Sequence, residues 1–339
     1  MSGVVRRRRA ALGSVQLQTE RSTPMKNFAI TGVGGFVAPR HLQAIRDTGN
    51  RLVAAVDPHD AVGVLDRYSF QVRFFSEIER FDRHLEKLRR GVEAERVHYV
   101  SICSPNYLHD AHIRLALRVG ADAICEKPLV INPWNLEALQ ELERETGRRV
   151  TTILQLRVHP DLIALRDRLA AERPSRPHEV CLTYITARGP WYDVSWKGKD
   201  ERSGGLVTNI GIHFFDLVVW LFGAVRHSEL HLNGEKRMAG WLELEQANVR
   251  WFLSTESSDL PFQPQPGAKT TFRSITVDGQ EIEFSEGFAN LHTRVYEEAL
   301  AGRGFGIDEA RPSIELTSNL RCGQTKTPNP ERRHPQLER

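Results

Sequence analysis

Cysteine is scarce in this chain, with four among 339 residues and none at the spacing of metal-binding pairs. This scarcity predicts a protein without a disulfide framework, in a reducing compartment such as the cytoplasm. Long hydrophobic runs are also missing, because no apolar stretch approaches the ~20 residues that a membrane helix needs. The net charge of +3 is small for this length, so we expect neither a nucleic-acid surface nor a membrane partner.

The chain is long enough for two domains, and its ends differ from the rest in composition. Arg6 to Arg9 are not followed by an apolar segment, so the first residues are not a secretory signal. An organellar transit peptide and a disordered extension remain as interpretations, and we expect the second. The predicted organisation is an N-terminal extension at 1–24, a first domain at 25–149, a second at 150–308 and a polar C-terminal tail at 309–339.

An apolar strand that runs into a glycine-rich turn opens the first domain. Residues 28–30 precede Gly32-Val33-Gly34-Gly35, a helical pattern follows at 38–48, and a second strand at 52–56 ends in Asp57. This order is the context of a dinucleotide-binding fingerprint, because glycines let the backbone approach a pyrophosphate and the helix N-terminus attracts it. Asp57 would bind the adenine ribose and repel a phosphate there, which favours NAD over NADP.

Strand and helix patterns keep alternating up to residue 149. This alternation predicts a parallel, doubly wound Rossmann sheet with helices on both faces. Ligands bind such sheets at the carboxyl ends of the strands. That rule brings together the residues that follow successive strands, namely Gly32, Asp57, Ser104-Pro105-Asn106 and Lys127. The segment 104–106 can also be read as a plain turn before a helix.

Alternating apolar and polar residues dominate the second half. Strand patterns occur at 180–187, 241–244 and 248–253, and Asp278-Gly279 joins two more in a hairpin signal. We therefore expect an α/β protein in which the Rossmann domain is followed by an α+β domain with a mostly antiparallel sheet. One face of that sheet would pack helices or another subunit.

Two segments of the second half contain candidate functional residues. His213 lies on a predicted apolar helix at 210–223, with Asn209 and Asp216 within reach on neighbouring turns. A histidine on an apolar helix is also common as a hydrogen-bonded core residue. The loop at 188–199 is rich in aromatic and basic residues, which fits a solvent loop, a nucleic-acid contact, or a contact to a diphosphate, a uracil or a carboxylate. No wider basic surface supports the nucleic-acid interpretation.

Two motifs together resemble the Gfo/Idh/MocA oxidoreductases. The first is Glu126-Lys127-Pro128, which follows the glycine turn, Asp57 and Ser104-Pro105-Asn106 with His109; the second runs from Gly204 to Asp216. The resemblance implies a bound NAD that oxidises the 3-hydroxyl of a UDP-sugar acid in bacterial surface-polysaccharide (O-antigen) biosynthesis. It also implies reoxidation of NADH by 2-oxoglutarate, and a homotetramer. Val37 departs from the family at the third glycine, and Asn209 stands where many relatives carry an aspartate.

The resemblance assigns roles to residues, with no metal ligand among them. We expect His213 to act as the general base and Lys127 to hold the hydroxyl oxygen, and the reverse assignment stays open. Two other functions also stay open: a redox-neutral lyase or hydrolase of the same fold, and a non-enzymatic NAD sensor. The expected catalytic residues are Lys127, His213 and Asn209; the cofactor-binding ones are Gly32, Gly34, Gly35, Phe36, Val37, Asp57, Ser104, Pro105, Asn106, His109, Glu126 and Lys127; the substrate-binding ones are Arg157, Arg188, Trp191, Tyr192, Lys197, Asn209 and His213.

Overall fold

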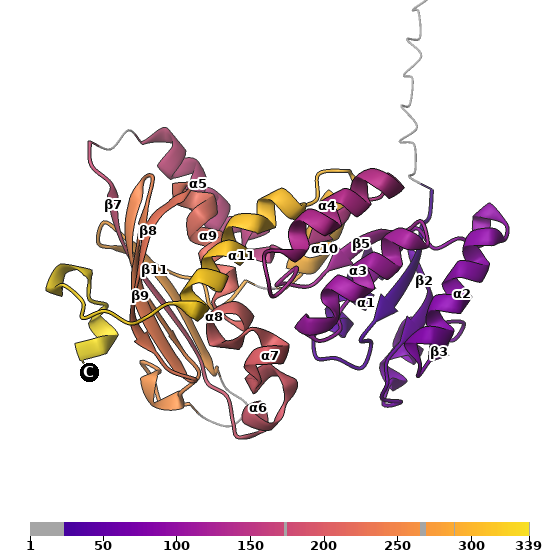
Figure 1. Cartoon of the computed structure of the whole chain (residues 1–339), viewed down its shortest axis with the longest axis horizontal. Coiled ribbons are helices and arrows are strands. Elements are labelled where there is room, and N and C mark those ends of the chain that lie inside the picture. Colours follow the sequence, from indigo (N-terminus) through magenta and orange to yellow (C-terminus); the bar gives the residue numbers. More distant parts are fainter. Residues whose placement is uncertain (1–23, 173–174, 265–268, 288, 339) are drawn as a thin grey trace, which may run out of the picture.

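The computed structural model describes residues 24–172, 175–264, 269–287 and 289–338. The N-terminal extension predicted at 1–24 lies, apart from its last residue, outside the described residues. The rest forms two sheet-centred halves side by side, with sheet A on the right of Figure 1 and sheet B on the left.

Sheet A is the predicted parallel Rossmann sheet. Its strand order is β3-β2-β1-β4-β5-β6, and every neighbouring pair is parallel. The strands are continuous apolar runs because helices cover both faces, and Phe28, Ala29 and Ile30 of β1 are fully buried. The strands are β1 (Asn27–Thr31), β2 (Arg51–Val56), β3 (Arg73–Phe75), β4 (Tyr99–Ile102), β5 (Asp122–Cys125) and β6 (Val150–Thr152), and the helices are α1 (Ala38–Asp47), α2 (Ile78–Arg90), α3 (His109–Arg118) and α4 (Asn135–Thr146).

Sheet B is mostly antiparallel, as predicted. Its order is β12-β11-β7-β10-β9-β8, in which β7 and β10 are parallel and the other neighbours antiparallel. Trp251, Phe214 and Phe215 are buried where α9 (Ile212–Phe222) packs with the sheet in one core, which also takes in α5 (Pro160–Ala171). The strands are β7 (His178–Thr186), β8 (Val225–Asn233), β9 (Arg237–Leu244), β10 (Ala247–Ser254), β11 (Thr271–Val277) and β12 (Gln280–Glu283).

Two helices near the C-terminus return to the first half. Tyr296 of α10 (Leu291–Leu300) is buried in the same cluster as Phe28. Helix α11 (Ile307–Cys322) contributes Ile314 to the core of sheet A and Leu320 to that of sheet B, and it lies centrally in Figure 1. The predicted boundary at 308/309 is therefore wrong, since it cuts through α11. Pro312 interrupts the helical pattern that the spaced apolar residues would otherwise indicate.

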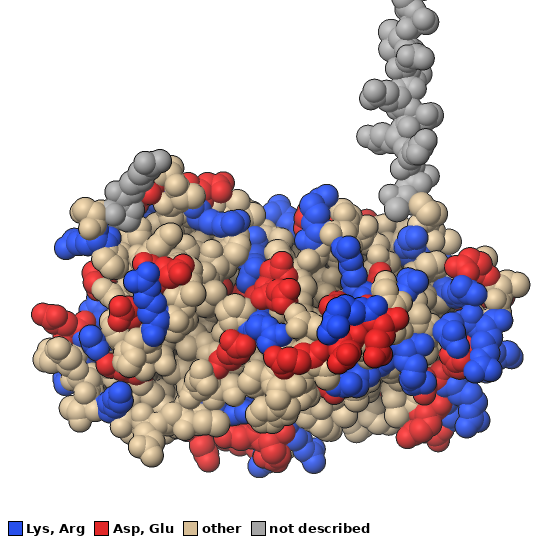
Figure 2. Space-filling model, turned by 45° about the horizontal axis from the view of Figure 1, so that its top comes forward, with Lys and Arg blue, Asp and Glu red and all other residues tan. Residues whose placement is uncertain are grey.

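Charged side chains of both signs lie on the surface. On the face in Figure 2, basic and acidic side chains are interspersed. Several form ion pairs, such as Arg118 with Asp82 at 2.8 Å. No single helix of the described ranges is long and apolar enough to cross a membrane, although residues 200–209 and 212–222 pass that test as a pair bent by 43°.

Candidate active site

The glycine turn lies at the carboxyl end of β1. Gly32 has a φ of +72°, and a Cβ added to it would lie 2.6 Å from the backbone of Cys103 and Ser104. Both oxygens of the buried Asp57 accept backbone hydrogen bonds at 2.9 Å, from Gly34 and from His59. Asp57, which would meet the ribose, is thus hydrogen-bonded directly to the turn that would meet the pyrophosphate.

We expect Gly32→Ala to destabilise the protein and to remove NAD binding. A left-handed φ costs about 1–2 kcal/mol for a residue with a Cβ, and the clash with the backbone of Cys103 adds to that cost because neither segment can move freely. Isothermal titration with NAD and thermal unfolding measure the two effects. Gly49→Ala is the matched control, since its φ is +74° but its Cβ would meet nothing within 4 Å. Equal loss of NAD binding in both variants would contradict the expectation.

Lys127 follows β5 and reaches across to the second half. Its Nζ donates a hydrogen bond of 2.8 Å to the backbone oxygen of Asn209, at the end of α8 (Gly205–Asn209). Burial lowers the pKa of the Lys127 ammonium, and the adjacent Glu126 carboxylate opposes that change. The hydrogen bond places the ammonium at the seam between the two halves, where the sequence predicts it.

His213 lies in the first turn of α9, four residues after the carbonyl that holds Lys127. Burial lowers the pKa of the imidazole well below its usual range, and the positive charge of Lys127 is the next largest cause. The ring is half-buried and has no hydrogen-bond partner among the described residues. The structure therefore brings together the two side chains that the sequence places in different domains, and it leaves the imidazole neutral at pH 7.

Asn209 joins the halves through its side chain as well. Its Nδ2 donates to the hydroxyl of Tyr192 at 2.8 Å, and its Oδ1 accepts from Nδ2 of Asn106 at 3.3 Å. Nδ2 of Asn106 also donates to the backbone oxygen of Ser203 at 2.9 Å. These bonds use Asn106, Asn209 and Tyr192 to connect the turn after β4 with the second half.

Cationic side chains gather around Lys127. Burial is the main cause that lowers the pKa of the Lys197 ammonium, and the positive charges of Arg188 and Lys127 lower it further. Burial opposes ionisation of Tyr184, but the charges of Arg273, Lys127 and Arg188 outweigh it and lower the pKa of that phenol. The guanidinium of Arg273 lies 5.0 Å from the centre of the Tyr184 ring. The site is thus positively charged on the side of sheet B.

Sequence reasoning missed Tyr184 and Arg273. They are direct partners in the antiparallel pairing of β7 with β11, although 89 positions separate them. The alternation of both strands was visible, but nothing local indicates that the two strands are neighbours.

Lys197 also faces the glycine turn. Its Nζ lies 5.8 Å from the ring centre of Phe36 and 5.6 Å from that of Trp191. Both rings are largely exposed, at 82% for Phe36 and 52% for Trp191. Phe36, Trp191 and Lys197 therefore form a contact between the glycine turn and the second half, while Val37, next to Phe36, is the residue before α1.

Arg157 forms a buried ion pair. Its guanidinium donates two hydrogen bonds to Asp216, at 2.7 and 3.0 Å, and a third to the backbone oxygen of Glu309 at 2.9 Å. Asp216 is thus held by Arg157 rather than by His213. The predicted substrate contact of Arg157 has no support in this geometry, because the protein itself occupies the guanidinium.

Two predicted cofactor contacts have buried side chains. The ring nitrogens of His109 lie 2.7 Å from the backbone oxygen of Pro128 and 2.9 Å from that of Ser104. Glu126 accepts hydrogen bonds from His41 and His292. We therefore assign His109 and Glu126 to holding the turns around the site rather than to touching the cofactor, and Ser104 and Pro105 contribute the turn itself.

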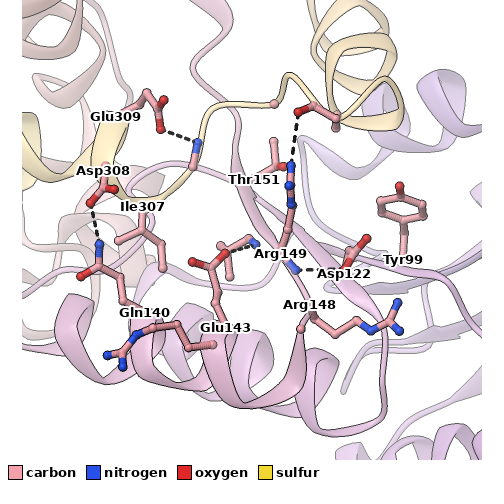
Figure 3. Close-up of a pocket in the computed structure, with 17 residues that line it drawn as sticks. Tyr99, Asp122, Gln140, Glu143, Arg148, Arg149, Thr151, Ile307, Asp308 and Glu309 are labelled. Carbon is pink, nitrogen blue, oxygen red and sulfur yellow. Dashed lines mark hydrogen bonds between the residues drawn. The ribbon is translucent and has the colours of Figure 1, made fainter.

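A separate pocket of about 620 Å³ lies at the other edge of sheet A (Figure 3). Its lining includes Tyr99, Asp122 and Val150, the first residues of β4, β5 and β6. Ligands of doubly wound sheets bind at the carboxyl ends of the strands, so this pocket does not belong to the predicted dinucleotide edge.

Two family models match the chain. The model of an oxidoreductase family with an NAD-binding Rossmann fold (GFO_IDH_MocA) matches residues 26–154. The C-terminal alpha/beta domain of the same oxidoreductase family matches residues 176–261. The two matches cover both halves of the site described above.

Solved structures and curated proteins agree with the family models. A WlbA (WbpB) dehydrogenase from Thermus thermophilus in complex with NAD and α-ketoglutarate is 53% identical, with a TM-score of 0.88 over 92% of this chain and 99% of that chain. Its complex with NAD and UDP-GlcNAcA is 52% identical, with a TM-score of 0.87 and the same coverage. D-apiose dehydrogenase from Paraburkholderia graminis is 24% identical over 64% of this chain and 55% of its own. The chain spans about half the length of the curated relatives it matches.

Proposed function

The chain belongs to the Gfo/Idh/MocA oxidoreductase family, and we propose that it is an NAD-dependent dehydrogenase that oxidises the 3-hydroxyl of UDP-GlcNAcA. The observation that supports the proposal is that Lys127 donates its hydrogen bond four residues before His213 and that its charge acts on the His213 imidazole. The relatives from Thermus thermophilus, with NAD and either UDP-GlcNAcA or α-ketoglutarate bound, supply the substrate class. We propose that this reaction serves bacterial surface-polysaccharide (O-antigen) biosynthesis.

The residues at the carboxyl edge of sheet A fit NAD. Gly32 lets the turn pack against the backbone of Cys103 and Ser104, where a Cβ would lie only 2.6 Å away, and Asp57 presents a carboxylate beside the turn. A 2′-phosphate would meet that negative charge, so the site favours NAD over NADP. When bound, NAD supplies the acceptor for the hydride that leaves C3 of the sugar.

Lys127 and His213 divide the proton chemistry between them. His213 takes the proton of the 3-hydroxyl, for which its neutral imidazole is available at pH 7. Lys127 donates a hydrogen bond to the same oxygen and stabilises the negative charge that develops there. The backbone oxygen of Asn209 aims the ammonium, and the side chain of Asn209 holds Asn106 and Tyr192. The reverse assignment, with Lys127 as the base, differs only in which group receives the proton.

The cationic side of the site suits anionic ligands. Arg188, Lys197 and Arg273 act on one another or on Lys127 through their charges. UDP-GlcNAcA carries a diphosphate and a carboxylate, and 2-oxoglutarate carries two carboxylates. We assign Arg188, Lys197 and the aromatic rings of Trp191 and Tyr192 to binding these groups. Arg157 is instead a positioning residue, because its ion pair with Asp216 orients the helix that bears His213.

We further propose a cytoplasmic homotetramer. All four cysteines are free, which suits a reducing compartment. The outer face of sheet B is the surface that we assign to subunit contacts. Part of it is covered by the C-terminal segment, where Arg332 lies 3.9 Å from the ring centre of Trp241 and His334 stacks on Phe252.

The test is to recycle the cofactor on the enzyme. We expect the purified protein to contain NADH, detected by mass spectrometry and by its absorbance, and 2-oxoglutarate to bleach that absorbance while 2-hydroxyglutarate forms. Succinate, which has both carboxylates but no ketone, is the control and should change nothing. With UDP-GlcNAcA added, turnover should then yield one 3-keto sugar for each 2-hydroxy acid. A product of elimination or hydrolysis, without any 2-hydroxy acid, would replace this function by redox-neutral chemistry.

A further inference from the structure

A buried hydrogen-bonded chain lies directly behind Lys127. Oε1 of Glu126 is 2.9 Å from Nε2 of His41 and 2.9 Å from Nε2 of His292. Nδ1 of His41 is 2.7 Å from the hydroxyl of Tyr296, which is 2.6 Å from Oγ of Ser101. All five side chains are nine-tenths or more buried. The chain therefore connects α1, β4, the turn after β5 and α10.

The direction of these hydrogen bonds follows from the chemistry of the groups. A carboxylate only accepts, so both Nε2 atoms that approach Glu126 carry hydrogens. Nδ1 of His41 then accepts from Tyr296, whose oxygen accepts in turn from Ser101. Burial lowers the pKa of His41, which agrees with a neutral ring that donates on one side and accepts on the other.

Glu126 is an anion in this setting. Burial works against its charge, but the hydrogen bonds from His292 and His41 outweigh burial and hold the pKa of the carboxyl well below its usual range. The groups that face it are His41 from α1, His109 from α3, His292 and Tyr296 from α10, Cys103 after β4, Cys125 of β5, and Lys127 and His213 at the site. Its negative charge raises the pKa of both Lys127 and His213.

We propose that His41 and His292 are positioning residues that hold Glu126 as a buried anion behind Lys127 and so keep the ammonium charged and in place. This role deepens the proposed function and rests on it, since Lys127 is the group through which the two histidines act. The catalytic residue, the first helix of the dinucleotide site and the returning helix α10 are thereby connected through a single carboxylate.

Removing the charge or one of its donors tests the proposal. Glu126→Gln keeps the shape but not the charge, and His292→Leu removes one donor. The first change removes the anion that supports the Lys127 ammonium, and the second removes one of the two hydrogen bonds that favour the ionised form of Glu126. We expect the limb of the kcat pH profile that Lys127 controls to move to lower pH by about one pH unit, so that kcat falls about tenfold at pH values above that limb. His292→Gln restores an N–H near the position of Nε2, and it should restore most of the wild-type pH profile and most of kcat.

His178→Leu is the matched control. It removes another hydrogen bond from a buried histidine to a carboxylate, from Nδ1 to the exposed Asp278 at 2.6 Å, at the other end of β7 from Tyr184. It should lower stability without moving the pH profile. An unmoved profile in both Glu126→Gln and His292→Leu would overturn the proposal, and so would an equal movement in His178→Leu. A stoichiometric metal ion in the purified protein would also overturn it, because the nitrogens would then bind the ion instead of the carboxylate.

A second readout does not depend on the substrate. The rate at which Lys127 reacts with acetic anhydride, followed by mass spectrometry across a pH series in the NAD-bound enzyme, reports the protonation of the amine directly. We expect half-maximal labelling of Lys127 at lower pH in Glu126→Gln and His292→Leu than in the wild type and His178→Leu. Should the wild type not turn over UDP-GlcNAcA, the proposed function fails while this titration still decides the role of the two histidines.

Discussion

Lys127→Met and His213→Asn are expected to bind NAD as the wild type does and to lose about 100-fold or more in kcat. Methionine keeps the apolar stem of Lys127 but cannot bind the developing oxyanion, and asparagine at 213 cannot take up a proton at neutral pH. Fluorescence titration with NAD and initial rates with UDP-GlcNAcA and 2-oxoglutarate separate binding from turnover.

The effects of the two substitutions on kcat should not be additive. If Lys127 and His213 act on one oxygen, the double variant should be little slower than the slower single variant. Lys87→Met, at an exposed lysine on α2, is the control for loss of a charge and should leave kcat unchanged. Rates near those of the wild type in both single variants would remove Lys127 and His213 from the chemistry.

Arg157→Ala should destabilise the protein by about 3–5 kcal/mol, because it leaves the carboxylate of Asp216 buried without its partner. The side chains of the pair are 8% and 3% exposed, and the guanidinium binds both carboxylate oxygens. Burial raises the pKa of Asp216 and the charge of Arg157 opposes that rise, so loss of the arginine favours the protonated acid. Thermal unfolding measures the loss of stability.

The double variant Arg157→Met with Asp216→Leu distinguishes the cost of an unpaired buried charge from the cost of lost packing. Apolar side chains of similar size fill the same space without a buried charge, so stability should return close to that of the wild type. Arg303→Ala, which breaks an exposed pair with Glu298, should leave the unfolding midpoint nearly unchanged. A small effect of Arg157→Ala on both unfolding and kcat would contradict the positioning role.

The first half was predictable because its signals are local. The glycines, the helix that follows them and Asp57 lie within 26 positions of one another, and β1 to β2 form as expected. The strands are buried on both faces, so they appear in the sequence as continuous apolar runs. Ligands bind at the carboxyl ends of such strands, and this rule predicts the position of Lys127. The mostly antiparallel sheet followed from alternation and from the Asp278-Gly279 turn.

The rest depends on contacts between distant segments. Strand β8 was missed because residues such as His227 and Glu229 leave it with little apolar alternation. His41 and His292 meet at Glu126 although 251 positions separate them, and neither has a motif of its own. Arg157 carried a functional prediction because the family resemblance assigns it to the substrate. Only the packing of α9 against residues 155–158 reveals Asp216 as its partner.

The return of α10 and α11 determines when the nucleotide half can be completed during synthesis. Val295 and Tyr296 fill the core beneath β1, and they leave the ribosome long after β1 has emerged. Residues 25–149 translated alone would lack those side chains and would expose the apolar surface that they cover. We therefore expect the first half to bind the dinucleotide only after α10 has been synthesised. A fragment that ends before α10 is unsuited to studies of dinucleotide binding.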